Sequence, residues 1–420
     1  MGGAPRALRR VPPVGDPGEV RLDPQGGLTT PALVLGAGTA AANALAYVTA
    51  AVLARATGPA VYGELAALVA LGIIGNVPAT ALQLVVARRT AAAGTGRDLR
   101  GIRAAAVTTA GLLLICVLLS PLLNAALDLH GLTAPLVLGL TLVPQTLTGA
   151  LFGDLLGRSA YGRLATAYVL AAAGRLVAAG TVAALGGSVV QILLAVAGAG
   201  VLTLFLTVLL CGLHRPVRSL TAAEAPPWRE LVGAGAVTGG VLVLTNLDLL
   251  MARAFLEPSA AGAYAVGSLF AKAAFWAPNF VTVLVYPRLA SGTGVRRALV
   301  RAMALTVAIG GVIVLVTALT ARPIISATSG SEYLDHATYP VTFAVLGALF
   351  ALAQLLLLSS VAMTDRRAEG LVWVAIAVEA VAMSLNHRSG AAILAVAVSI
   401  NLLLVLAGLV LRRRDLVVTT

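Results

Sequence analysis

The chain has 420 residues, of which 59% are hydrophobic and only 11% are charged, and its mean hydropathy is +0.96. Soluble domains average about 25% charged residues, so this composition excludes a soluble globular protein and indicates a polytopic membrane protein. The net charge of +12 resembles that of a nucleic-acid-binding protein. However, the arginines stand in short runs between apolar segments, which is the layout of membrane topology signals, so we expect no nucleic-acid partner.

The first 28 residues are rich in proline and glycine and contain four arginines. They lack both an apolar run and a small-residue cleavage site, so they do not match a signal peptide. We expect a disordered cytoplasmic tail. The two cysteines, Cys116 and Cys211, both fall inside apolar segments, so neither a disulfide framework nor a zinc site is expected.

Twelve apolar segments are long enough to cross a bilayer as helices, for which roughly 20 residues suffice. The sequence therefore predicts an all-α fold. The expected spans are about 31–54, 62–87, 104–125, 134–156, 164–185, 189–212, 230–252, 262–287, 298–321, 340–363, 370–386 and 390–411.

The distribution of basic residues tests this topology. With both termini in the cytoplasm, 23 of the 29 basic residues fall in inner segments and 4 in outer loops. This asymmetry is what the positive-inside rule predicts, and it assigns the loop arginines a role in topology alone. The outer four are Arg55, Arg253, Arg322 and Arg388. The two that remain lie within the membrane, and they are Arg175 and Lys272.

The longest inner connection contains a Pro226–Pro227 pair and mixed charge, which is typical of a linker. The predicted organisation is a tail at 1–28, a six-helix lobe at 29–213, a cytoplasmic linker at 214–229, a second six-helix lobe at 230–411 and a basic cytoplasmic tail at 412–420.

The two halves share a pattern. Ala54-Arg55-Ala56, Gly58-Pro59 and Tyr62-Gly63 in the first half match Ala252-Arg253-Ala254, Pro258, and Gly262 with Tyr264 in the second. Pro78 precedes Arg88 by ten residues, as Pro278 precedes Arg288. An offset of about 200 residues, or six spans, preserves orientation. It therefore predicts two parallel repeats with a central cavity between the lobes.

The stretch 262–288 contains Lys272, the only lysine in the chain. At about 1.5 Å per residue, Lys272 lies roughly 15 Å below Gly262, close to the middle of the bilayer. A cation at that depth is costly unless it faces protein or water. Pro278 removes one backbone donor and favours a kink in the same span.

Two segments resemble a known family. They are LARATGPAVYGELAAL (53–68), followed by VVARR (85–89), and LTNLDLLMARAFLEPSAAGAYAVGSLFAKAAFWAPNFVTVLVYPRLA (244–290). Both resemble motifs of the oligosaccharide flippases in the multidrug/oligosaccharidyl-lipid/polysaccharide exporter superfamily. The matching residues in the second segment are Thr245-Asn246-Leu247-Asp248, Gly262-Ala263-Tyr264 and Pro287-Arg288. The two segments cover under a fifth of the chain.

The resemblance implies a flippase that moves a polyprenyl-diphosphate-linked oligosaccharide to the outer leaflet by alternating access of two lobes. The loop arginines indicate a plasma membrane, and the resemblance implies a bacterial one with polysaccharide-assembly enzymes as neighbours. We expect contact with membrane lipids and no cofactor. Twelve spans without an extra pair make the related peptidoglycan-precursor flippases a less favoured assignment.

A diphosphate carries about two negative charges, so the cavity it crosses needs cations. We expect Arg175 in one lobe and Lys272 in the other to clamp the phosphates, since arginine suits bidentate contact and lysine acts as a point charge. Alternatively, Lys272 forms a buried ion pair with Glu379 or Asp248, and Arg175 packs between helices or extends to the surface.

Two acidic residues within the spans, Asp248 and Glu379, are candidates for ion coupling or gating. Asn246, Asn279 and Asn76 are candidates for substrate binding, and Asn43, Gln83 and Gln145 could also line a cavity, although hydrogen bonds between helices explain each of these equally well. Asp154 and Arg158 are four residues apart and predict a local ion pair.

Two other functions remain open. A cation-coupled multidrug exporter of the same superfamily predicts an acidic cavity, whereas the in-span charges here are not clearly acidic. A membrane enzyme of surface-polysaccharide assembly needs a cluster of acids and bases, and only Glu332, Asp335 and His336 come close. No GxxxxGK[ST] phosphate loop is present, so an ATPase is not expected.

Overall fold

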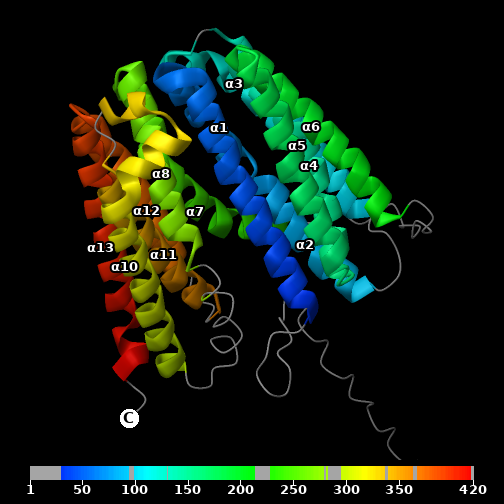
Figure 1. Ribbon diagram of the computed structural model, residues 1–420. Helices are drawn as coiled ribbons and strands as arrows, with labels where there is room; N and C mark the ends of the chain where they lie inside the picture. The colour runs from blue at the N-terminus through cyan, green and yellow to red at the C-terminus, as the bar shows by residue number, and fades with distance from the viewer. Residues whose placement is uncertain are drawn as a thin grey trace, which may run out of the picture.

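The computed structural model describes residues 30–93, 99–129, 131–212, 228–278, 281, 295–335, 339–362 and 367–417. The predicted all-α architecture is confirmed within these residues (Figure 1). The helices are α1 (Thr30–Gly75), α2 (Val77–Ala93), α3 (Leu99–Ala126), α4 (Thr133–Gly157), α5 (Tyr161–Ala184), α6 (Val189–Cys211), α7 (Trp228–Phe255), α8 (Pro258–Trp276), α10 (Val295–Thr328), the short 3-10 helix η1 (Ser331–Asp335), α11 (Pro340–Ala362), α12 (Arg367–Leu385) and α13 (Gly390–Val417).

The described helices supply a segment for each of the twelve predicted spans. Nine of them are long and apolar enough to cross a membrane, and a shorter apolar helix covers Gly370–Leu385. One of the nine runs over the 60 residues Leu33–Ala92, about 90 Å at helical rise and far longer than one crossing. This stretch divides at Gly58, whose φ of 72° is left-handed and suits glycine. The chain is therefore a multi-pass membrane protein.

Proline interrupts the second span of each lobe. In the first lobe the helix breaks at Asn76, two residues before Pro78. In the second lobe α8 ends at Trp276, and Ala277 and Pro278 form a turn. The end of α8 two residues before Pro278 agrees with the predicted interruption, and most of 279–294 lies outside the described residues. Proline has no backbone N–H to donate, which is consistent with a helix that is interrupted close to each proline.

The helices form two lobes with the same internal pairing. In each lobe the first span packs on the fifth, the second on the fourth, the third on the fourth, the fourth on the sixth and the fifth on the sixth. The lobes meet where α1 and α2 of the first lobe pack on α7 and α8 of the second. In Figure 1 they converge at the top and diverge toward the bottom. This shared pairing supports the predicted parallel repeat.

Small residues set the closest packing inside the first lobe. Gly149, Gly153 and Gly157 lie four residues apart on α4, and a side chain on each would collide with the main chain of α2. Without a hydrophobic force between helices in lipid, such close approach is a main source of packing energy. Gly347 on α11 has the same relation to Ala271 on α8, so both lobes use this contact.

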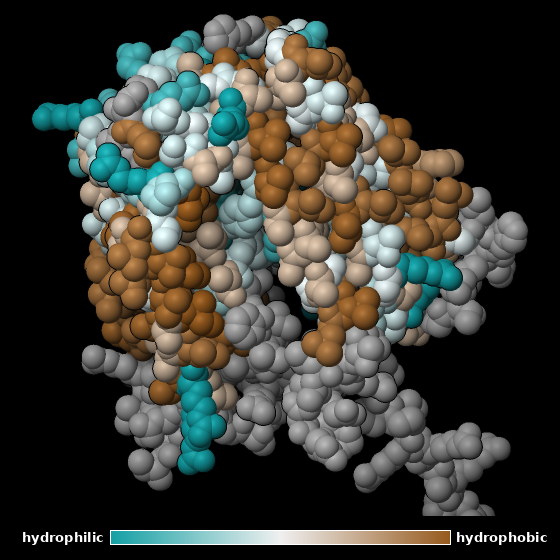
Figure 2. All heavy atoms as spheres, in the orientation of Figure 1, coloured by the Kyte–Doolittle hydropathy of each residue, from teal (hydrophilic) through white to brown (hydrophobic). Residues whose placement is uncertain are grey.

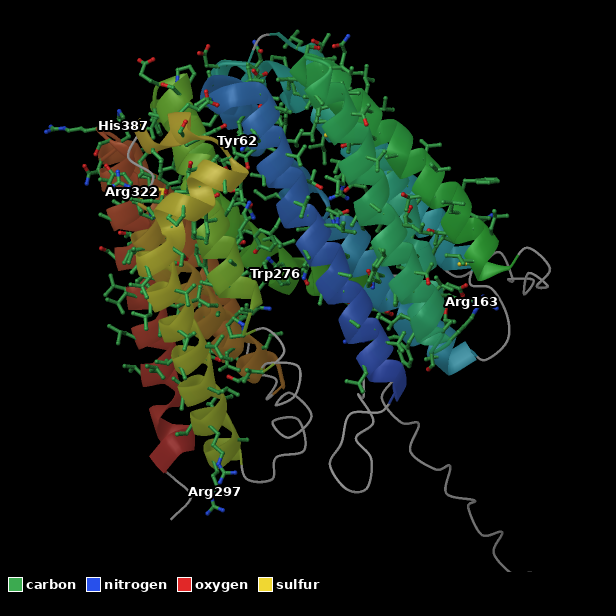
Figure 3. All side chains as sticks on the ribbon, in the orientation of Figure 1. Tyr62, Arg163, Trp276, Arg297, Arg322 and His387 are labelled. Atoms are coloured by element: carbon green, nitrogen blue, oxygen red, sulfur yellow. The ribbon has the colours of Figure 1, made fainter. Side chains whose placement is uncertain are left out.

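The surface agrees with the predicted topology. Figure 2 shows apolar side chains covering the flanks of both lobes, including Leu118, Val177 and Leu319, whose exposed fractions are 67%, 66% and 74%. Figure 3 shows Arg163 and Arg297 toward the lower ends of the lobes and Arg322 and His387 toward the upper end. The lower side is the predicted cytoplasmic side.

Two segments of the predicted organisation lie mainly outside the described residues: the tail at 1–28 and the linker at 214–229. Helix α7 begins at Trp228, inside the predicted linker, and α13 continues to Val417, so most of the predicted tail at 412–420 belongs to the last helix.

Candidate functional site

A cavity of about 220 Å³ lies inside the N-terminal lobe, between α2, α4, α5 and α6. Its wall includes many polar side chains, which are Asn76, Thr80, Gln83, Gln145, Thr148, Tyr168, Arg175 and Thr203. Typical small-molecule pockets measure roughly 300–1,000 Å³. The cavity is therefore smaller than a typical site for a drug-sized ligand, and it is too small for a whole oligosaccharide.

The polar groups of this cavity are only partly satisfied. The Gln83 Nε2 donates to the Tyr168 hydroxyl at 2.6 Å. The hydroxyls of Thr148 and Thr203 donate to carbonyls of their own helices, which leaves their lone pairs as acceptors. The buried Oδ1 of Asn76 has no hydrogen-bond partner in the part of the chain that the structure describes. Unsatisfied buried groups of this kind favour a polar ligand or water.

Arg175 is the one charged side chain among the residues that line this cavity. It lies on α5 and is exposed to the cavity. No hydrogen bond or ion pair to it occurs within the described residues. A guanidinium with five free donors on a polar wall is an anion-binding group.

The C-terminal lobe holds a different cluster. Asp248 is buried, and its Oδ2 accepts a hydrogen bond of 3.0 Å from the Tyr264 hydroxyl. Asp248 and Lys272 line a cavity of only about 10 Å³, together with the hydroxyl side chains of Thr245 and Ser268 and apolar residues of α7, α8 and α11. That volume is close to the smallest that holds one water molecule. Lys272 interacts electrostatically with Asp248, but the described residues contain no ion pair between them.

Glu379 completes this cluster from α12. The residue is 0% exposed, and neither carboxylate oxygen has a hydrogen-bond partner among the described residues. Its charge interacts with that of Asp248. An isolated buried carboxylate costs several kcal/mol or more, so this group is stable only when protonated or when a cation is bound.

The structure thus divides the predicted site residues between two places. Arg175 and Asn76 line the first-lobe cavity, as do Gln83 and Gln145. Lys272, Asp248 and Glu379 come together in the second lobe. The expected clamp, in which Arg175 and Lys272 share one cavity, is not formed in this conformation. The reason is that every residue of the first cavity belongs to one lobe.

The other residues singled out in the sequence lie outside both cavities or outside the described residues. The buried Asn246 donates to the Leu242 carbonyl at 2.8 Å and lines neither cavity. Asn279 lies outside the described residues, as does His336. The predicted ion pair of Asp154 with Arg158 is confirmed at 2.6 Å. No group of three or more metal-ligating side chains occurs among the residues described.

Sequence reasoning missed several polar residues of these sites. Tyr168 and Thr203 face the first cavity, and Tyr264, quoted only as part of a motif, bonds to Asp248. A helical-wheel comparison would have found Tyr168, because it lies seven residues before Arg175 on the same face.

Comparison with known proteins supports a transporter fold. No family model matches the chain, and no curated protein matches it. Among solved structures, an inward-facing multidrug resistance MATE family transporter of the MOP superfamily aligns over 89% of this chain and 94% of its own, at TM-score 0.69 and 13% identity. An outward-facing form aligns over 96% of each chain, at TM-score 0.59 and 15% identity.

A third solved structure is a MOP superfamily transporter from Pyrococcus furiosus, described as having a binding pocket of reversed polarity. It aligns over 91% of this chain and 95% of its own, at TM-score 0.61 and 14% identity. At these identities the likeness establishes the fold and nothing finer. The inward-facing structure has the higher TM-score of the two MATE conformations compared, 0.69 against 0.59. The chain therefore has the fold of the MOP superfamily transporters.

Proposed function

We propose that this protein is an alternating-access exporter whose cargo is a phosphate-bearing lipid-linked oligosaccharide. The observation that carries the proposal is Arg175, whose guanidinium has no partner among the described residues and is the one charged group that they place on the wall of a polar cavity. A cationic drug would meet a like charge there, whereas a diphosphate would meet a bidentate donor.

The size of the cavity is consistent with this cargo if recognition is limited to the phosphates and the first sugar. Asn76, Gln145 and the threonine hydroxyls offer donors and acceptors for sugar hydroxyls. The rest of the glycan would then lie between the lobes, which diverge toward the bottom of Figure 1. Trp276 is 40% exposed and lies at the end of α8, on the side of the second lobe that faces the first lobe in Figure 3.

In this proposal the acidic cluster of the second lobe couples transport to an ion. Asp248 and Glu379 would exchange a proton or cation during the cycle, because Glu379 cannot remain charged and unpaired. The membrane potential would also contribute, since outward movement of one negative charge releases about 2.3 kcal/mol per 100 mV. Lys272 would modulate the cluster instead of touching the cargo in the inward-facing state.

A cation-coupled multidrug exporter is the second candidate. It is favoured by the solved multidrug resistance transporters that share the fold and by the buried Glu379. In that case the acidic cluster, and not Arg175, would bind the cargo.

Proteoliposomes that contain a fluorescent polyprenyl-diphosphate oligosaccharide test the proposal. An outside quencher would follow the fraction of lipid that changes leaflet, for the native protein and for Arg175→Ala. We expect the exchange rate to fall by about tenfold or more, the effect of losing a charge-assisted hydrogen bond of roughly 1.5–3 kcal/mol.

Arg163→Ala is the matched control, because Arg163 lies on the same helix outside the cavity and bonds only to the Leu210 carbonyl. We expect it to exchange lipid like the native protein, and Arg175→Lys to retain part of the rate. Native exchange that Arg175→Ala leaves unchanged would remove the assigned site. The absence of native exchange, combined with efflux of cationic drugs, would favour the second candidate.

A further inference from the structure

Two arginines at equivalent positions of the repeat each reach into the opposite lobe. Arg55 lies in α1 just before the Gly58 break, and its Nη1 donates to the Ala327 carbonyl at 3.0 Å. Arg253 lies near the end of α7, and its Nε and Nη2 donate to the carbonyls of Leu127 and Asp128 at 3.0 and 2.7 Å. Topology alone, the role predicted from the sequence, does not require these contacts.

The acceptors are also equivalent. Leu127 follows the end of α3, and Ala327 lies in the last turn of α10, so each arginine binds the outer end of the other lobe's third span. Carbonyls at a helix C-terminus lack helical partners and carry partial negative charge, which makes them good acceptors for a guanidinium. The two contacts are not equal, because Arg253 is 3% exposed whereas Arg55 is exposed.

A tyrosine adds a third contact between the lobes on the same side. Tyr333 of η1 is fully buried, and its hydroxyl donates to the Ala54 carbonyl at 2.9 Å. Its ring packs edge-on against Tyr62, with 6.3 Å between the centroids. Burial raises the pKa of Tyr333, so the phenol remains protonated and able to donate. Figure 3 shows Tyr62 near the top, where the lobes converge.

The backbone beside these residues shows the same two-fold pattern. A side chain at Gly262 would collide with the Pro59 carbonyl, and one at Gly63 would come within 3.0 Å of the Pro258 carbonyl. The helices after each outer turn therefore cross in direct main-chain contact. Such a crossing leaves room for one helix to tilt on the other, and the three hydrogen-bonding side chains stand next to it.

We propose that Arg55, Arg253 and Tyr333 form an outer latch, which holds the outer mouth closed and is released in each transport cycle. Separation of the outer ends removes the arginines from their carbonyls, and water then replaces the lost bonds. The net strength of a charged hydrogen bond is modest because of this exchange, so the latch is reversible. The inference requires that the lobes move, but it does not depend on the identity of the cargo.

Distances between spin labels in lipid nanodiscs, measured by double electron–electron resonance, test the latch without any substrate. The outer pair is Leu185→Cys with Leu385→Cys, at 82% and 81% exposure. The inner pair is Gly162→Cys with Gly370→Cys, where an added Cβ has no atom within 4 Å. Both pairs are placed on a background with Cys116→Ala and Cys211→Ala.

In Arg55→Ala/Arg253→Ala we expect the ratio of outward-open to inward-open populations to rise by at least about tenfold, because several charged hydrogen bonds are lost. The outer distance should lengthen while the inner distance shortens. Tyr333→Phe keeps the ring and removes one bond, so it should shift both distances in the same direction by less. Arg322→Ala and Arg388→Ala, exposed arginines of the same side, should match the native distribution.

Distributions that coincide with the native one in both the double variant and Tyr333→Phe would overturn the latch. A shift of the outer pair without an opposite shift of the inner pair would also overturn it, since it would indicate local loosening. If the variants shift the outer and inner distances as expected but the native protein exchanges no lipid, the proposed cargo is rejected and the latch is retained.

Discussion

The two lobes share their helix pairing but differ in their interiors. The first encloses about 220 Å³ lined by amides, hydroxyls and one arginine. The second encloses about 10 Å³ beside an aspartate and a lysine. The positions that match between the repeats, such as Arg55 with Arg253 and Gly63 with Gly262, lie at the contact between the lobes. The repeat therefore conserves the contact between the lobes, whereas the interiors of the two lobes differ in chemistry.

The largest effect should come from the packing that both lobes have in common. Gly153→Leu forces a side chain into the main chain of α2, and Gly347→Leu does the same at α8. We expect each to lower the free energy of unfolding by about 3 kcal/mol or to prevent folding, since overpacking of this kind displaces backbone. Thermal unfolding in detergent would measure this loss of stability. Gly111→Leu, with no atom near its added Cβ, should unfold like the native protein, and equal behaviour of Gly153→Leu would contradict the tight-contact account.

A second test separates the two cations. Arg175→Gln should weaken binding of a short-chain prenyl diphosphate by about tenfold or more, whereas Lys272→Gln should change it by less than about threefold, because only Arg175 lines the larger cavity. Titration followed by tryptophan fluorescence would measure both affinities. Equal losses in the two variants would mean that the cations share one site, as the sequence predicts.

The buried carboxylate of the second lobe allows a third test. Glu379→Gln removes the charge with little change in shape, so we expect diphosphate affinity to stay within about twofold and the ion or pH dependence of transport to disappear. The protein should also become more stable by about 1 kcal/mol, because a neutral amide is less costly to bury. Transport at several pH values and sodium concentrations would measure the coupling. The exposed Glu332→Gln serves as the control, and unchanged coupling in Glu379→Gln would exclude Glu379 as the ion site.

The smallest effect concerns a contact between the lobes at their surface. The Arg89 Nη2 and the Glu230 Oε1 lie 3.0 Å apart, with 25% and 55% of the side chains exposed. Exposed pairs contribute about 0–1 kcal/mol and weaken with salt. Arg89→Ala should therefore shift the unfolding temperature by about 1 °C and leave transport within twofold. A large loss of transport would indicate that this pair gates the cycle.

Much of the fold is encoded locally and could be predicted. Apolar run length and arginine placement identify the spans, and the offset between Pro78 and Pro278 identifies the repeat. The ends of α8 were misplaced because hydropathy does not register a turn inside an apolar stretch. Arg175 and Asn76 were found because polar groups at membrane depth are expensive.

The relation between the site residues could not be predicted. Whether Arg175 and Lys272 share a cavity depends on the position of one lobe relative to the other, which is set by tertiary structure. The role of Arg253 was missed for the same reason, because its acceptors are main-chain carbonyls more than 120 residues away. Every residue has a main-chain carbonyl, so residue type does not indicate which carbonyls accept these hydrogen bonds.

The glycines of α4 have a consequence for ligand discovery. Gly149 lies on the cavity wall, and α4 rests there on the main chain of α2 at Ala79 and Gln83. This part of the wall is backbone against backbone and has no rotamers with which to adapt to a ligand, whereas the amide, hydroxyl and guanidinium side chains of the other parts can change rotamer. Fragments that contact the α2–α4 side should therefore show a steeper dependence of affinity on shape than fragments that contact the side of Gln145 and Arg175.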